Sequence, residues 1–98
     1  MSDLRFVWDS RKASANEKKH GVSFEEAESV FLDEQALLIG DPEHSEDEDR
    51  FVLLGLGVRL RILVVCHYYR ESDSEIRLIS ARKADRAERK EYNERSHR

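Results

Sequence analysis

The sequence predicts an α+β domain in which helices pack against an antiparallel β-meander. Apolar runs typical of strands lie at 51–54 and 62–65, in the second half of the chain. Helix-capping residues precede apolar residues at helical spacing near both ends of the chain. At 98 residues, the chain is expected to form one domain, 1–98, that buries roughly 65% of its unfolded surface.

The first half of the chain predicts one strand followed by two helices. Residues 4–8 form a short apolar strand, and a helix follows over 10–20. Gly21 then supplies the left-handed conformation that commonly ends a helix. A capping box at 23–26, with serine first and glutamate three residues later, starts a second helix that ends at Asp33.

The second half predicts four strands and a closing helix. The strands are expected at 36–39, 50–56, 61–67 and 75–81, and a second capping pattern starts a helix over 86–95. The element order is therefore β-α-α-β-β-β-β-α.

Charge is distributed unevenly along the chain. Residues 1–49 hold 14 acids and 5 bases, whereas residues 50–98 hold 7 acids and 12 bases, so a net charge of -4 hides a basic second half. Six of the acids lie in one segment, 41–49, which predicts an exposed loop. The acidic pI therefore does not exclude a nucleic-acid partner, because local charge matters more than the total.

The composition argues against a membrane protein and against a disulfide framework. No apolar run approaches the ~20 residues that span a bilayer, and the N-terminus has no signal-peptide pattern. A single cysteine, Cys66, is interpreted as a small buried core residue. We expect a cytoplasmic protein.

Basic and imidazole side chains cluster in four segments that could hold phosphate groups. Guanidinium groups beside a strand end suit this task because they donate in a fixed, bidentate geometry. The meander brings 67–70 near Arg77, but it does not by itself bring them near Arg82. A solvated charged surface is the alternative interpretation. The four segments are 18–21, 67–70, Arg77 and 82–83.

Two further features have open interpretations. The acidic segment contains His44 and offers oxygen ligands, but its spacing is not diagnostic of a metal site and a solvated loop is favoured. Tyr68 and Tyr69 are consecutive strand residues, so one side chain must point to each face of the sheet. One of them could therefore stack on a base while the other packs in the core.

Taken together, these motifs resemble the BrnT family of toxins from bacterial type II toxin–antitoxin systems. The resemblance covers nearly the whole chain, and its specificity lies in the combination of segments 19–22 and 79–82 at this separation. The chain departs from the family at Glu34, where proline is common, and in the apolar connection 56–60. The matching positions are Trp8-Asp9, Asn16, Lys19–Ala27, Val30-Phe31, Asp33, Asp41, His44-Ser45, Glu48, Arg50-Phe51, Gly55, Arg61, Leu63–Val65, Arg70, Ile79–Ala84, Glu88-Arg89 and Tyr92.

The resemblance implies a RelE/ParE-like fold and a ribonuclease that arrests translation. It also implies a small BrnA-like antitoxin that masks the toxin, and operon DNA would be bound only through the antitoxin complex. The reaction expected is RNA cleavage by attack of a ribose 2′-hydroxyl, with no cofactor and no metal. Such chemistry needs positioning, a base and cations for the developing charge.

Seven residues are assigned to this reaction by chemistry and position. Arg82 and Arg70 are expected to clamp the transition state. His67 is the favoured acid/base group because imidazole titrates near neutrality, with His20 in reserve, although His67 could instead bond to backbone. The flanking phosphates are assigned to Lys19, Arg77 and Lys83.

Two non-catalytic functions remain open from the sequence. A ParE-like protein could inhibit a protein target without cutting RNA, or the basic face could serve only to bind the antitoxin. Metal-free RNA cleavage that is lost in Arg82→Ala distinguishes the enzyme from both.

Overall fold

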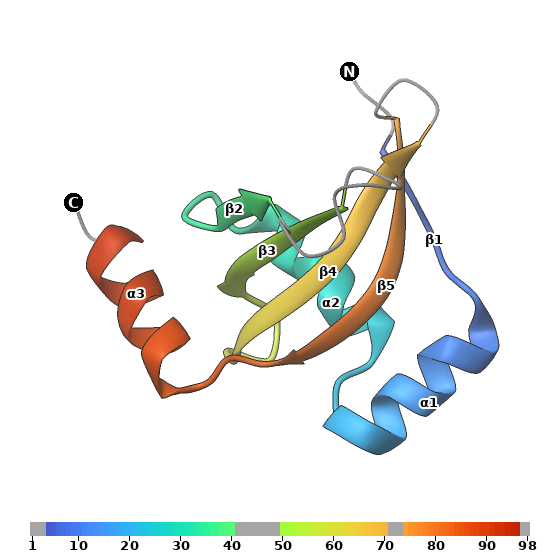
Figure 1. The fold of residues 1–98 in the computed structure, drawn as a ribbon, viewed down its shortest axis with the longest axis horizontal. Helices are drawn as coiled ribbons and strands as arrows, with labels where there is room; N and C mark the ends of the chain where they lie inside the picture. The colour runs from blue at the N-terminus through green and yellow to red at the C-terminus, as the bar shows by residue number, and fades with distance from the viewer. Residues whose placement is uncertain (1–3, 41–49, 71–73, 97–98) are drawn as a thin grey trace.

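A computed structural model describes residues 4–40, 50–70 and 74–96 (Figure 1), so the acidic segment 41–49 and its His44 lie outside the described residues. Nine elements follow one another. They are β1 (Arg5–Val7), α1 (Ser10–His20), α2 (Phe24–Ser29), the 3-10 helix η1 (Val30–Leu32), β2 (Leu37–Gly40), β3 (Arg50–Leu56), β4 (Ile62–Arg70), β5 (Glu75–Lys83) and α3 (Arg86–Ser96).

The five strands form one sheet in the order β1-β5-β4-β3-β2. Strands β2 to β5 are an antiparallel meander, as the sequence predicts, whereas β1 joins the edge of β5 in parallel. Strands β4 and β5 run to Arg70 and Lys83, and so extend past their predicted ends at 67 and 81. Sheet pairing overrides the polar character of those ends, because each residue finds a partner across the ladder.

The predicted helix ends are confirmed in their atomic detail. The Asp9 carboxylate accepts hydrogen bonds from the first backbone N–H groups of α1, and Gly21 ends that helix with φ 71°. The Ser23 hydroxyl accepts from the Glu26 N–H at 3.0 Å. In the second capping box, Asp85 accepts from the Glu88 N–H at 2.8 Å, and Glu88 accepts from the Asp85 N–H at 2.9 Å.

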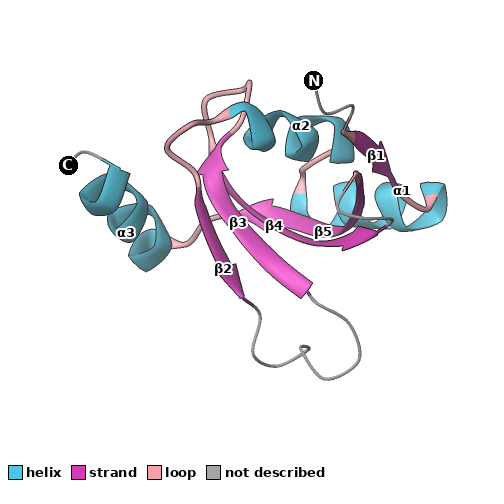
Figure 2. Ribbon diagram, turned by 90° about the horizontal axis from the view of Figure 1, so that it is seen from above, coloured by secondary structure: helices cyan, strands magenta, loops and turns pink. Residues whose placement is uncertain are grey.

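The main core lies between the sheet and the helices α1 and α2. Both helices lie on the same side of the sheet (Figure 2), where alternate strand residues meet Phe24 of α2. Leu63, Val65, Ile76 and Leu78 are buried there almost completely. Burial of apolar side chains of this size contributes roughly 1.5–3 kcal/mol each, so this cluster is the principal source of stability.

Among the described elements, α3 alone covers the opposite face of the sheet, hereafter the open face, and it does so at one end. Helix α3 packs there through Tyr92 against Leu54 and Val64. The Tyr92 hydroxyl donates to Asp33 at 2.6 Å, which fixes the helix to the turn before β2. Cys66 is half-buried on this face, so its interpretation as a core residue is wrong. No helix among the described residues is long and apolar enough to cross a membrane.

Candidate functional site

The open face of the sheet gathers basic side chains from β3 and β5, with a tyrosine of β4 between two of them. Tyr68 of β4 lies in register between Arg50 of β3 and Arg77 of β5, while Arg82 lies opposite Val64 further along β5. Residues in register across a ladder point to the same face, so these side chains share one surface. We call Arg50, Tyr68, Arg77 and Arg82 the basic face.

A bulge in β5 makes this arrangement possible. Cys66 pairs with Ser80 and the next residue, His67, pairs with Leu78, so Ile79 is left over in the register. Arg77 and Arg82 are five positions apart, and regular alternation would place them on opposite faces. The extra residue restores the same face for both, which is a common use of bulges beside functional sites.

Arg82 is held rigidly at the edge of the open face. Its Nη1 and Nη2 donate to the two carboxylate oxygens of Glu88 at 2.8 and 2.9 Å. This hydrogen bond raises the pKa of Arg82 and lowers that of Glu88, each partly opposed by burial. The Arg82 side chain stays 43% exposed. Nη1 also lies 3.4 Å from the Lys83 carbonyl. Because these contacts use only the terminal nitrogens, no described residue occupies the Nε edge of the guanidinium, which can meet a ligand.

The end of α1 is attached to β5 beside Arg82 by a buried asparagine. The Asn16 amide donates to the carbonyls of Val22 and Ala81 at 2.9 and 2.8 Å, and its oxygen accepts from the Ala81 N–H at 3.0 Å. Asn16 thus pairs with β5 in place of a neighbouring strand. His20 lies one helical turn beyond Asn16, so Lys19 and His20 are placed at the Arg82 end of β5.

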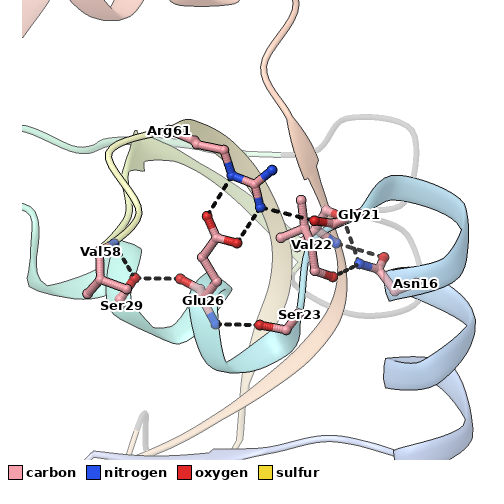
Figure 3. Close-up of polar contacts among 9 residues, drawn as sticks. Asn16, Gly21, Val22, Ser23, Glu26, Ser29, Val58 and Arg61 are labelled. Atoms are coloured by element: carbon pink, nitrogen blue, oxygen red, sulfur yellow. Dashed lines mark hydrogen bonds and ion pairs between the residues drawn. The ribbon is translucent and has the colours of Figure 1, made fainter.

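An ion pair between a buried glutamate and a partly exposed arginine fixes the same helix end from the other side (Figure 3). Arg61 donates to both carboxylate oxygens of Glu26, at 2.9 and 2.5 Å, and its Nη2 also donates to the Gly21 carbonyl at 3.0 Å. The hydrogen bond to Glu26 raises the pKa of Arg61. Glu26 is 4% exposed, so loss of its partner would leave a buried charge uncompensated.

His67 does not lie on the basic face. Its side chain is fully buried on the helix-covered side, with ring contacts to Phe31, Phe51 and Tyr69. Burial lowers the pKa of the imidazole, and Nδ1 lies 3.2 Å from the Val65 carbonyl. His67, the predicted acid/base group, therefore lies on the other side of the sheet from Arg82. Its contact with a backbone carbonyl agrees with the alternative interpretation of this residue.

Arg70 and Arg82 lie at opposite ends of the sheet. Arg70 is in register with Glu75, and Arg82 with Val64, so six residues of β4 separate them, or about 20 Å at the usual strand rise. The Arg70 guanidinium lies 3.7 Å from the Glu75 carboxylate. Two arginines so far apart cannot clamp one phosphate, and the expectation that they act as a pair is wrong.

The remaining predicted residues are distributed along β5. Arg77 lies on the open face two residue pairs from the Arg70–Glu75 end of the ladder, and Lys83 is exposed at the other end of β5, near Arg82. Tyr68 points to the open face and Tyr69 packs against the main core, which confirms one tyrosine on each side. Segments 18–21 and 82–83 therefore lie toward the Arg82 end of β5, whereas Arg77 and segment 67–70 lie toward its start.

Sequence reasoning missed the residues that position these groups. Asn16, Glu26, Arg61 and Glu88 were named only as positions of the family motif, and Glu26 also as part of a capping box. Their partners could not be predicted, because pairing across 35 or 65 residues leaves no local pattern. Among the residues that the structure describes, no three His, Cys, Asp or Glu side chains gather closely enough to hold a metal ion.

The fold and its open face define a small α+β protein with a basic surface suited to a polyanion. The family model described as "Ribonuclease toxin, BrnT, of type II toxin-antitoxin system" matches residues 8–88. The chain therefore belongs to the BrnT family of ribonuclease toxins, which confirms the resemblance drawn from its motifs. Membership in this family implies a ribonuclease activity and a cognate antitoxin.

A solved structure agrees with this assignment at the level of the fold. The crystal structure of the Brucella abortus ribonuclease toxin BrnT is 24% identical to this chain, with a TM-score of 0.66. The match covers 85% of this chain and 99% of that one, and it confirms the expected fold class. No curated protein matches the chain.

Proposed function

We propose that this toxin cleaves RNA on the basic face without a metal ion, and that Arg82 stabilises the transition state. The observation that supports this proposal is the shared orientation of Arg82, Arg77 and Tyr68 on the sheet face that α1 and α2 leave open. A single-stranded RNA can reach an open sheet, whereas the other face is filled by the core.

The proposed step is an intramolecular transesterification. The ribose 2′-oxygen forms a bond to the adjacent phosphorus and the bond to the 5′-oxygen breaks, which leaves a 2′,3′-cyclic phosphate and a 5′-hydroxyl. Negative charge grows on the phosphoryl oxygens, where the Nε edge of Arg82 can donate. A preorganised donor of this kind typically contributes about 3–4 kcal/mol to transition-state stabilisation. Glu88 positions the guanidinium before the RNA arrives.

The proton transfers are assigned to His20 rather than to His67. A base must reach the 2′-hydroxyl within hydrogen-bond distance, and His67 is fully buried on the opposite side of the sheet. His20 is half-buried at the end of α1, one helical turn after Asn16, whose amide bonds to Ala81 next to Arg82 on β5. It takes the 2′-hydroxyl proton, and the departing 5′-oxygen receives a proton from the imidazolium or from water.

The remaining basic residues bind the flanking RNA. Lys19 and Lys83 are exposed near Arg82, and Arg77 lies four residue pairs away, or about 13 Å, so it holds a different phosphate. Tyr68, in register with Arg77, offers a ring on which a base can stack beside that phosphate. Arg70 reaches only RNA at the far end of the sheet. Affinity that depends on these cations must fall with rising salt.

In the cell, cleavage would inhibit translation, and a BrnA-like antitoxin would neutralise the toxin. Operon DNA would be bound only by the complex of toxin and antitoxin. These roles follow from the family, whose members are ribonuclease toxins of type II systems.

The test is cleavage of total RNA in EDTA by the purified chain. Arg82→Ala is expected to lose roughly 10²–10³-fold in rate. Arg11→Ala, an exposed arginine at the start of α1, is the matched control and should keep full activity. Intact RNA with folded wild-type protein would overturn the proposal.

One observation favours a second function. Because Glu88 already binds both terminal nitrogens of Arg82, the ion pair could serve only to fix α3 to the sheet. The toxin would then bind a protein target, as ParE-like relatives do. In that case neither wild type nor Arg82→Ala would cut RNA, and Arg82→Ala would lose stability alone.

A further inference from the structure

An apolar groove lies on the helix-covered side of the molecule, away from the basic face. Its volume is about 560 Å³, and it is lined by Leu4 and β1 on one side and by α2 with η1 on the other. Figure 2 shows the ribbons of β1 and α2. Leu4, Phe6, Phe31 and Leu32 supply the apolar lining. The rings of Phe6 and Phe31 meet edge to face at 5.0 Å, so they pack together as part of this lining.

The high exposure of Leu32 is unusual for a large apolar side chain. Leu32 is 81% exposed at the mouth of the groove, and Leu4 on the opposite wall is 46% exposed. A single exposed leucine is ordinary, but paired apolar walls around a hollow mark a binding surface. A second, smaller hollow that also contains Leu32 extends the apolar surface to Val58.

The rim of the groove is acidic. Glu25 and Glu28 line it, and with Leu32 they follow the spacing of one side of a helix. Neither glutamate has an ion pair with another residue that the structure describes. The groove therefore combines an apolar floor with two carboxylates that have no cationic partner within 4–40, 50–70 and 74–96. It fits a segment with apolar side chains and neighbouring Lys or Arg.

We infer that this groove holds an amphipathic, basic helix of the cognate antitoxin. The inference rests on the proposed function only in requiring an antitoxin, which the family implies. A helix suits the site because it places apolar anchors at i, i+3, i+4 and i+7 into a groove. An added strand suits it less, because β1 spans only three residues and offers few backbone hydrogen bonds.

The groove and the basic face lie on different sides of the sheet, so binding of the antitoxin helix is separate from inhibition of RNA cleavage. The lining residues Phe6 and Phe31 belong to the side of the sheet that α1 and α2 cover, whereas Arg82 and Arg77 belong to the other side. A helix seated in the groove would hold the antitoxin on the toxin without itself touching the basic face. Variants in the groove should therefore change antitoxin binding and leave the activity of the free toxin unchanged.

The experiment measures binding of the purified antitoxin, encoded beside the toxin, by titration calorimetry. Leu32→Asp is compared with Leu60→Asp, a leucine of nearly equal exposure (79%) outside the groove. The double variant Glu25→Lys/Glu28→Lys tests the rim. RNA cleavage by each free toxin is measured in parallel, and the oligomeric state of each is measured by sedimentation.

The inference requires Leu32→Asp to weaken antitoxin binding about tenfold or more, with Leu60→Asp close to wild type. The rim variant should weaken binding most at low salt. Equal binding by Leu32→Asp, or equal losses in both leucine variants, would overturn the inference. So would a wild-type dimer that Leu32→Asp dissociates, because the occupant would then be a second copy. If the free wild-type toxin cuts no RNA, the proposed activity fails but the binding comparison still decides this inference.

Discussion

Asn16 provides the sharpest test of how the fold positions the site. We expect Asn16→Ala to destabilise the protein, because the amide makes three hydrogen bonds to backbone and is 8% exposed. Its removal leaves the Ala81 N–H, the Ala81 carbonyl and the Val22 carbonyl without their side-chain partner. At about 1 kcal/mol for each net hydrogen bond, the loss is about 3 kcal/mol.

That loss is large for a chain of this size. Domains are stable by only about 5–15 kcal/mol, and each kcal/mol shifts the Tm of a 60–100-residue domain by about 4–8 °C. The Tm should therefore fall by about 12–24 °C. Urea denaturation is the assay, because a lower midpoint with an unchanged slope reports stability alone.

A matched control separates the hydrogen bonds from helix propensity. Ser14→Ala makes a similar gain in propensity at an exposed position of α1 and should stay within about 0.5 kcal/mol of wild type. Asn16→Asp keeps the acceptor but loses both donors and buries a charge, so it should be at least as damaging as Asn16→Ala. A loss below about 1 kcal/mol in Asn16→Ala would refute the reasoning, because water would then satisfy the three groups.

Two further predictions concern the attachment of α3. In Glu88→Gln, Arg82 loses its carboxylate partner while the helix cap can persist, so we expect kcat to fall about tenfold or more. The KM for RNA should fall as well, because a negative charge leaves the binding surface. An unchanged kcat would contradict this prediction. Tyr92→Phe removes the 2.6 Å bond to Asp33 and should cost about 1.5–3 kcal/mol in urea denaturation. Burial and that bond raise the pKa of Tyr92 to about 12. The contribution of Tyr92 to the free energy of unfolding should therefore be complete below the ordinary pKa near 10 and be lost as pH rises through about 12. A Tyr92→Phe variant with the same pH profile would exclude the tyrosine as its source.

Local patterns in the sequence predicted most of the secondary structure. The two capping boxes and Gly21 predicted the helix ends because a cap is satisfied within a few residues of its own helix. The strand cores at 50–56 and 62–65 were predictable because their apolar residues must be buried whatever the partner strand. Strand ends were less predictable, since pairing with a neighbour decides how far a strand continues.

In the candidate site too, local features were predictable and features that depend on tertiary contacts were not. Charge and position in the sequence were enough to propose Arg82, Arg77, Lys19 and Lys83 as site residues. The motifs indicated the family. The choice of His67 depended on its chemistry alone, and chemistry does not state which side of a sheet a residue occupies. Burial of that imidazole against three aromatic rings is a tertiary fact.

The sequence by itself determined the element order, the basic second half of the chain and the family, because these depend on residue type and short-range spacing. Only the tertiary structure decided which charges share a surface. The extra residue Ile79 brings Arg77 and Arg82 to one face, and the register of β4 with β5 moves Arg70 about 20 Å away. Both outcomes arise from pairing between strands, where a shift of one residue reverses the direction of every side chain that follows.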